Sequence, residues 1–164
     1  MRQATAYKII KIAAVLAVLI SLFLLYQHYA KESSRFCNFG KSFSCDIVNK
    51  GEYSTVDGVA NLALSLVFGA NFYLNIPIPN SLISVIVFGF MFFAAHNLQK
   101  KKSFLGMREG ALLKAMQGIM VASILYAFFL IYIEAAVLYS WCIFCLALDA
   151  VMLVMAIAVF SIKR

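Results

Sequence analysis

Four cysteines are the residues of this sequence whose type and spacing could do redox chemistry. Cys37 and Cys45 are separated by seven residues in a polar stretch, and Cys142 and Cys145 form a Cys-x-x-Cys motif where a long apolar run begins. Residues three apart on a helix share one face at about 5–6 Å, which is compatible with a disulfide. The N–H groups and dipole at a helix start favour a thiolate, the attacking species in thiol–disulfide exchange. The sequence therefore offers two pairs suited to such exchange.

Four long apolar runs must position these cysteines. The chain has 164 residues, of which 64% are hydrophobic and 13% are charged. This composition excludes a disordered chain and argues against a water-soluble domain. Each run is long enough to cross the roughly 30 Å hydrocarbon core of a bilayer. We predict an all-α membrane protein, a single domain over residues 1–164 built as a four-transmembrane-helix bundle, with spans at about 9–27, 80–98, 111–133 and 142–162.

The basic residues indicate how the spans are oriented. The net charge is +7, but the Lys and Arg residues flank the apolar runs and form no polar face, so nucleic-acid binding is not expected. Four spans put both termini and the lysines at 100–102 on one side, which the positive-inside tendency makes cytoplasmic. That side holds ten of the fourteen basic residues: Arg2, Lys8, Lys11, Lys100, Lys101, Lys102, Arg108, Lys114, Lys163 and Arg164.

Both cysteine pairs then face the extracytoplasmic side, where disulfides form and persist. In a prokaryote the membrane would be the plasma membrane, and in a eukaryote that of the endoplasmic reticulum. Cys37 and Cys45 would be exposed to proteins in the outer loop, whereas Cys142 and Cys145 would lie at the lipid boundary. This arrangement suits a relay from a soluble dithiol to a lipid-soluble electron acceptor.

The outer loop, at about residues 30–79, contains a fifth apolar stretch at 58–73 that is short and interrupted by two asparagines. If it spanned the membrane, the lysine triplet would lie outside and the Cys-x-x-Cys motif would face the cytoplasm. We therefore predict a half-buried horizontal helix on the outer end of the bundle. A fifth span is the alternative.

The cysteines also allow non-catalytic interpretations. A structural zinc site would lack the two tight knuckles that such sites use. Two inert structural disulfides in a non-enzymatic membrane scaffold are more credible. Against them, a membrane bundle has little need of covalent links, and a Cys-x-x-Cys bridge closes a loop too short to add much stability.

Taken together, these residues resemble the vitamin K epoxide reductase family over nearly the whole chain. The resemblance rests on the end of the first span at 25–31, the loop pair Cys37 and Cys45, Asp46 directly after it, Gly58, Asn80 with Ser81, and residues 137–145. The loop pair precedes a Cys-x-x-Cys motif on the last span. This order separates the family from the bacterial disulfide-bond oxidases, in which the motif lies in the first outer loop.

The resemblance implies a bundle surrounding a quinone of the ubiquinone, menaquinone or vitamin K type, capped by the outer loop. By position, Cys145 would interact with the quinone ring and Cys142 would exchange with the loop. Cys45 would be the shuttling loop cysteine, and Cys37 the one exposed to a thioredoxin-like partner. Asn80 matches the family asparagine that hydrogen-bonds a quinone oxygen. Its alternative role is to cap a helix that begins at the next residue.

Three positions depart from the family pattern. Gly51 stands where a serine is usual, Asn49 replaces an aromatic residue, and Asp149 replaces the tyrosine of the epoxide-reducing member. These changes argue against epoxide reduction and leave the relay from thiols to a quinone intact. Because the quinone couple is the more oxidising one, we predict a thiol–disulfide oxidoreductase that promotes disulfide formation, with vitamin K quinone or epoxide reduction as the alternative.

Two acids lie in or near the spans. Asp149 follows Cys145 by one turn on the same helical face, and an ionisable residue inside a span usually faces the bundle interior. It would be a proton donor or hydrogen-bond partner for the quinone. Alternatively, it would be a buried acid paired with Gln117, Ser123 or Asn61. Glu134, near the outer end of the third span, is predicted to be solvated.

Overall fold

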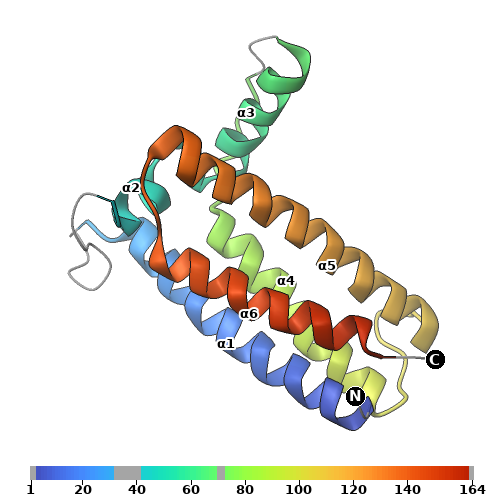
Figure 1. Ribbon diagram of the computed structural model, residues 1–164. Coiled ribbons are helices and arrows are strands. Elements are labelled where there is room, and N and C mark those ends of the chain that lie inside the picture. The colour runs from blue at the N-terminus through green and yellow to red at the C-terminus, as the bar shows by residue number, and fades with distance from the viewer. Residues whose placement is uncertain (1–2, 32–41, 70–72, 163–164) are drawn as a thin grey trace.

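Four long helices form a bundle in the computed structural model, which describes residues 3–31, 42–69 and 73–162 (Figure 1). All four are long and apolar enough to cross a membrane. The predicted all-α, four-span architecture is therefore confirmed, and the chain is an integral multi-pass membrane protein. The bundle helices are α1 (Gln3–Tyr29), α4 (Asn80–Gln99), α5 (Glu109–Tyr132) and α6 (Ile143–Phe160).

Two helices extend beyond the apolar runs that predicted them. α1 begins at Gln3 and carries Lys8 within it, because a helix continues through polar residues as long as its backbone bonds are satisfied. After α5 the chain continues as a π-helical turn, η2 (Ile133–Leu138), which hydropathy alone did not distinguish from the span. Single π-helical turns within helices are frequent at functional sites.

Small side chains let α1 pack closely on α4. Ala13, Ala14 and Ala17 of α1 are buried in one core cluster with Ala94 and Ala95 of α4. Small residues at such interfaces allow the backbones of membrane helices to approach each other. α1 also packs extensively on α6, whereas α4 and α5 make less contact with each other. A cavity between α4, α5 and α6 occupies the space that this weaker packing leaves.

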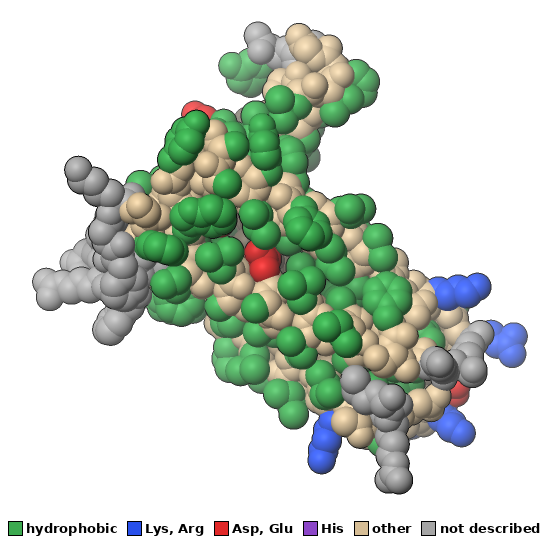
Figure 2. Space-filling view, viewed as in Figure 1, with side chains coloured by type: hydrophobic (Ala, Val, Ile, Leu, Met, Phe, Trp, Pro, Cys, Tyr) green, Lys and Arg blue, Asp and Glu red, His purple; other side chains and the backbone are tan. Residues whose placement is uncertain are grey.

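The two ends of the bundle differ in charge. The start of α1 and the end of α6 lie at the same end (Figure 1), and Lys and Arg side chains gather there on an otherwise largely apolar surface (Figure 2). The opposite end carries α2 (Cys45–Lys50), the 3₁₀ turn η1 (Glu52–Ser54) and α3 (Val56–Phe68). Placing the termini at one end agrees with the predicted topology, and the side of the membrane on which they lie stays a prediction.

The short apolar stretch of the outer loop forms α3, which ends at Gly69 in the left-handed conformation (φ +63°). Its 13 residues extend about 20 Å, too short to cross the bilayer, so the alternative of a fifth span is wrong. α3 projects from the bundle end instead of lying across it (Figure 1). Val59 is its one buried residue, and the side chains of Leu66, Val67 and Phe68 are 59–73% exposed. This apolar tip is what an interfacial helix presents to a membrane surface.

A glycine allows α3 to start tightly against η1. A Cβ atom built at Gly58 would overlap the carbonyl oxygen of Glu52 and lie 3.3 Å from the Cα atom of Tyr53. Tyr53 and Ser54 of η1 line the cavity. The close approach at Gly58 therefore supports one wall of the cavity.

We expect Gly58→Ala to lower the free energy of unfolding by about 1–3 kcal/mol, because backbone atoms must shift to admit the methyl group. The matched control is Gly118→Ala in α5, where a Cβ atom would meet nothing within 4 Å. That substitution should be neutral or stabilising by up to about 1 kcal/mol. Thermal unfolding of both variants in detergent tests this, and equal melting temperatures would contradict the packing role of Gly58.

Candidate redox site

Three cysteine sulfurs lie together at the bundle end opposite the chain termini. The thiol of Cys142 donates a hydrogen bond to Sγ of Cys45 at 3.4 Å, and the backbone N–H of Cys145 donates to Sγ of Cys142 at 3.2 Å. Cys45 is disulfide-bonded, whereas Cys142 and Cys145 are free thiols. A thiol this close to a disulfide sulfur is placed for exchange. Cys37 lies outside the described residues, so its role stays a prediction.

The Cys-x-x-Cys motif lies at the start of α6 as predicted, but Cys142 itself is not part of the helix. It is the N-cap residue, in an extended conformation, and its sulfur takes the place of a capping oxygen by accepting the Cys145 N–H. An N-cap side chain normally satisfies one of the free N–H groups of the first turn. The two sulfurs therefore lie beside the positive end of the α6 dipole.

A short backbone pairing brings the outer loop to this motif. Phe43 forms a parallel bridge with Trp141. The N–H of Ser44 donates to the Trp141 carbonyl at 3.1 Å, and the N–H of Trp141 donates to the Ser42 carbonyl at 3.0 Å. Cys45 and Cys142 follow directly after these paired segments, so the register of the bridge sets their sulfurs side by side.

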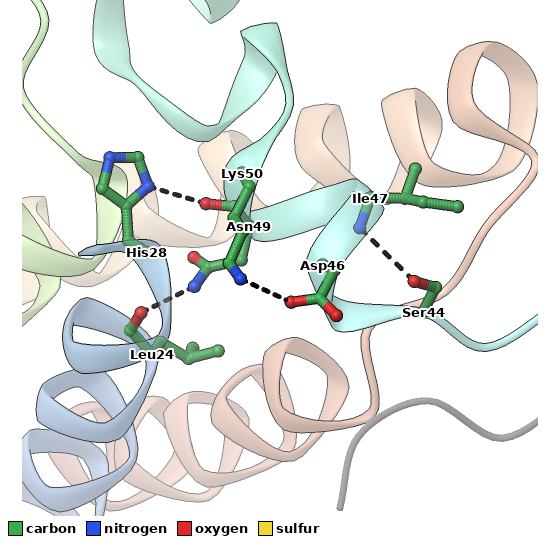
Figure 3. A network of polar contacts seen from close by, with 7 residues as sticks. All are labelled: Leu24, His28, Ser44, Asp46, Ile47, Asn49 and Lys50. Carbon is green, nitrogen blue, oxygen red and sulfur yellow. Dashed lines mark hydrogen bonds and ion pairs between the residues drawn. The ribbon is translucent and has the colours of Figure 1, made fainter. Parts of the chain in front are cut away.

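A second set of contacts fixes α2 to the end of α1 (Figure 3). Cys45 is the first residue of α2. The side-chain amide of Asn49 donates to the Leu24 carbonyl at 2.6 Å, and Nδ1 of His28 donates to the Asn49 carbonyl at 2.6 Å. Asn49 is buried, so an unpaired amide there would be costly. The asparagine that departs from the family pattern thus has a structural role: it positions α2 and with it Cys45.

A cavity of about 470 Å³ opens beside Cys145. Its volume is within the range of small-molecule sites, and such sites combine apolar walls with a few polar groups. The walls are mostly apolar, with Phe88 of α4, Ile119 of α5 and Leu148 of α6 among them. The polar and ionisable side chains that line it are Asn49, Tyr53, Ser54, Asn80, Ser81, Ser84, Ser123, Tyr126, Glu134, Cys145 and Asp149.

Asn80 lies in the cavity wall, held from two sides. Its side-chain amide donates to the Tyr53 carbonyl at 3.0 Å, and its Oδ1 accepts from the Tyr126 hydroxyl at 2.8 Å. α4 begins at Asn80 with Pro79 at the N-cap position and no side-chain capping bond, so the capping alternative is wrong. An amide has two N–H donors, so one remains after the bond to Tyr53.

Ser81 is a cavity residue for which sequence analysis predicted no role of its own. Its hydroxyl is buried, lines the cavity and has no hydrogen-bond partner within the described part of the chain. A buried hydroxyl without a partner calls for an explanation, because most such groups are satisfied. A ligand with a carbonyl oxygen would satisfy it. The residues present therefore fit a quinone, whose ring needs apolar walls and whose two oxygens accept hydrogen bonds.

Asp149 lines the same cavity as Cys145. The alternative that it pairs with a polar neighbour is not supported: Asn61 instead bonds the backbone of Leu74 at 3.1 and 2.8 Å. Neither Gln117 nor Ser123 makes a hydrogen bond with Asp149 among the described residues, although Ser123 also lines the cavity. Its carboxyl group therefore faces the space that a ligand would fill.

The prediction that Glu134 is solvated is wrong. Its side chain is 4% exposed, lines the cavity and accepts the backbone N–H of Cys142 through Oε2 at 3.1 Å. Its backbone carbonyl accepts from Ser140 at 3.1 Å, so Glu134 holds the chain where it returns towards α6. The acid inside a long apolar helix was the available signal. Position in the sequence does not settle the matter, because a residue near the end of a span can face either water or the bundle.

A membrane bundle that holds neighbouring cysteine sulfurs beside an apolar cavity defines a class, the membrane oxidoreductases that exchange electrons between thiols and a lipid-soluble acceptor. The sequence profile of the vitamin K epoxide reductase family matches residues 8–160, nearly the whole chain. The chain therefore belongs to the vitamin K epoxide reductase family and is an oxidoreductase of quinone-linked chemistry. A comparison with curated proteins found no match.

Proposed function

We propose that this protein is a quinone-linked membrane thiol–disulfide oxidoreductase. It takes electrons from a thioredoxin-like protein through Cys37 and Cys45, then through Cys142 and Cys145, and so promotes disulfide formation. The observation that carries the proposal is the position of the Cys142 thiol. It lies 3.4 Å from the disulfide-bonded sulfur of Cys45 and next to Cys145, which opens to the cavity.

The relay has a definite order of bonds. The reduced partner attacks the disulfide of the loop pair and leaves it as a dithiol. The Cys45 thiolate then attacks Cys142 in the Cys142–Cys145 disulfide, so that a Cys45–Cys142 bond forms and Cys145 leaves as a thiolate. Attack by the second loop thiol releases Cys142. The arrangement in the structure, with Cys45 oxidised and both α6-associated thiols free, supports this order because it is the state that follows the last step.

The cavity supplies the groups that would hold the acceptor. A bound quinone would take up two electrons and two protons and leave as the quinol. The free N–H of Asn80 and the unpartnered hydroxyl of Ser81 offer hydrogen bonds to its oxygens. Asp149 offers a proton from the wall near Cys145. Because quinones are stronger oxidants than protein disulfides, electrons should flow from thiols into the cavity.

The topology that fits this function places the termini in the cytoplasm and the cysteines outside. The Lys and Arg residues at the terminal end support it through the positive-inside tendency (Figure 2). Disulfides persist in the outer compartment, where a thioredoxin-like partner would carry them to other proteins.

Two alternatives remain to be separated. The scaffold with two inert disulfides disagrees with the free thiols of Cys142 and Cys145. Reduction of vitamin K quinone or its epoxide would use the same cysteine relay and would differ from the proposed function in the substrate that accepts the electrons. Asp149, in place of the tyrosine of the epoxide-reducing pattern, favours thiol oxidation over epoxide reduction.

The test is dithiothreitol-driven reduction of purified ubiquinone, menaquinone and vitamin K quinone analogues, with vitamin K epoxide assayed in parallel. We expect reduction of at least one quinone and no turnover of the epoxide. Protein with all its thiols blocked by N-ethylmaleimide is the control and should be inactive. Turnover of the epoxide would select the alternative, and inactivity of the unblocked protein with every quinone would contradict the proposal.

A further inference from the structure

Glu134 occupies a place where an uncharged side chain would serve the same structural purpose. The carboxyl group accepts the Cys142 N–H at 3.1 Å, a bond that the amide oxygen of glutamine could also accept. Burying a carboxylate costs several kcal/mol unless it is well compensated. No basic side chain forms an ion pair with Glu134 within residues 3–31, 42–69 and 73–162. The acid therefore calls for a role beyond fixing the chain.

The cysteines next to Glu134 must release protons when they are oxidised, and little water reaches Cys142 to accept them. Cys142 is 0% exposed, and it packs in an apolar cluster with Leu24 and Cys45. Joining Cys142 and Cys145 in a disulfide breaks two S–H bonds, and two protons must leave. The side chain of Glu134 is held at the backbone of Cys142 and shares a cavity with Cys145 and Asp149. These two carboxyl groups are the acids that line this cavity.

We propose that the carboxylates of Glu134 and Asp149 accept the two thiol protons when Cys142 and Cys145 are oxidised, Glu134 acting beside Cys145 in the cavity that the two residues share. Two S–H bonds break, one S–S bond forms and two electrons pass to the acceptor in the cavity. The two protons move to the two carboxylates and from them to the reduced acceptor. The inference rests on the proposed function, since it takes a quinone as that acceptor.

The surroundings of Glu134 limit which groups its charge can influence. Three residues face Glu134 from α6 and its N-cap position, namely Cys142, Cys145 and Asp149. Across the cavity lie Tyr53 of η1 and Tyr126 of α5, and Cys45 of α2 lies beyond Cys142. Glu134 and Asp149 are the carboxyl groups among these neighbours, so an effect of a carboxyl group on the thiols has these two residues as its sources.

The test compares Glu134→Gln with wild type and with the matched control Glu109→Gln, an exposed acid near the other end of α5. In reduced, quinone-free protein in detergent, alkylation of Cys145 by iodoacetamide is followed against pH by mass spectrometry. We expect an inflection from Glu134 in the wild-type profile and in the control, and its loss in Glu134→Gln. Quinone reduction should fall on the order of 100-fold in this variant, the usual contribution of a proton-transfer group.

Glu134→Asp keeps an acid and should retain the inflection and part of the rate, which separates proton transfer from misfolding. An alkylation profile of Glu134→Gln that superimposes on wild type would overturn the inference, as would an altered profile with unchanged quinone reduction. If wild type reduces no quinone, the proposed function fails, and the alkylation profile still decides whether Glu134 is coupled to Cys145.

Discussion

Cys145→Ala is expected to lower dithiothreitol-driven quinone reduction on the order of 1,000-fold or more, because it removes the only sulfur of the motif that lines the cavity. Cys142 cannot substitute for it, since its side chain is fully buried and its thiol points to Cys45. The measurement is the initial rate of quinol formation by purified variants in detergent.

Cys37→Ala provides the contrast that establishes the order of the relay. Dithiothreitol is small enough to reach the inner cysteines directly, so this variant should keep part of its activity with the small thiol. With a thioredoxin-like protein as donor, the same variant should be inactive, because the partner depends on the loop pair. Equal activity of Cys145→Ala and wild type would refute the assignment of Cys145 as the residue that faces the acceptor.

Cys145→Ala is also expected to hold more of the protein in a disulfide between Cys45 and Cys142 than wild type does. The two sulfurs are 3.4 Å apart, and the backbone pairing of Phe43 with Trp141 holds their segments in register. Without Cys145, Cys142 has no partner for the motif disulfide, so its thiol stays available to attack Cys45 in the loop disulfide, which forms the Cys45–Cys142 bond and releases the Cys37 thiol. Digestion without reductant, followed by mass spectrometry, would detect the loop peptide linked to the peptide that contains Cys142.

The control for this trapping is Cys142→Ala, in which no link between the loop and α6 should form. Blocking free thiols before digestion prevents exchange during the work-up. If Cys145→Ala shows no more Cys45–Cys142 link than wild type does, then the two sulfurs do not exchange, and the contact between them is only one of packing.

Local properties of the sequence determined the spans and the chemistry available to them. Hydropathy located all four membrane helices, because a span must be apolar along nearly its whole length whatever its neighbours are. The Cys-x-x-Cys motif at the start of the last span predicted a helix N-terminus beside the cysteines, and Cys142 is the N-cap of α6. The pattern of motifs along the chain identified the family correctly.

Contacts between distant segments determined the rest. The adjacency of Cys45 and Cys142 depends on a bridge between residues 43 and 141, which no local pattern encodes. Hydropathy could not show that Glu134 turns inwards, because a residue at the end of a span can face water or the bundle with the same sequence around it. Likewise, the length of α3 is local, whereas its projection away from the bundle follows from how its first turn packs on η1. Sequence therefore determined which groups are present and in which helices, and tertiary packing determined which of them meet.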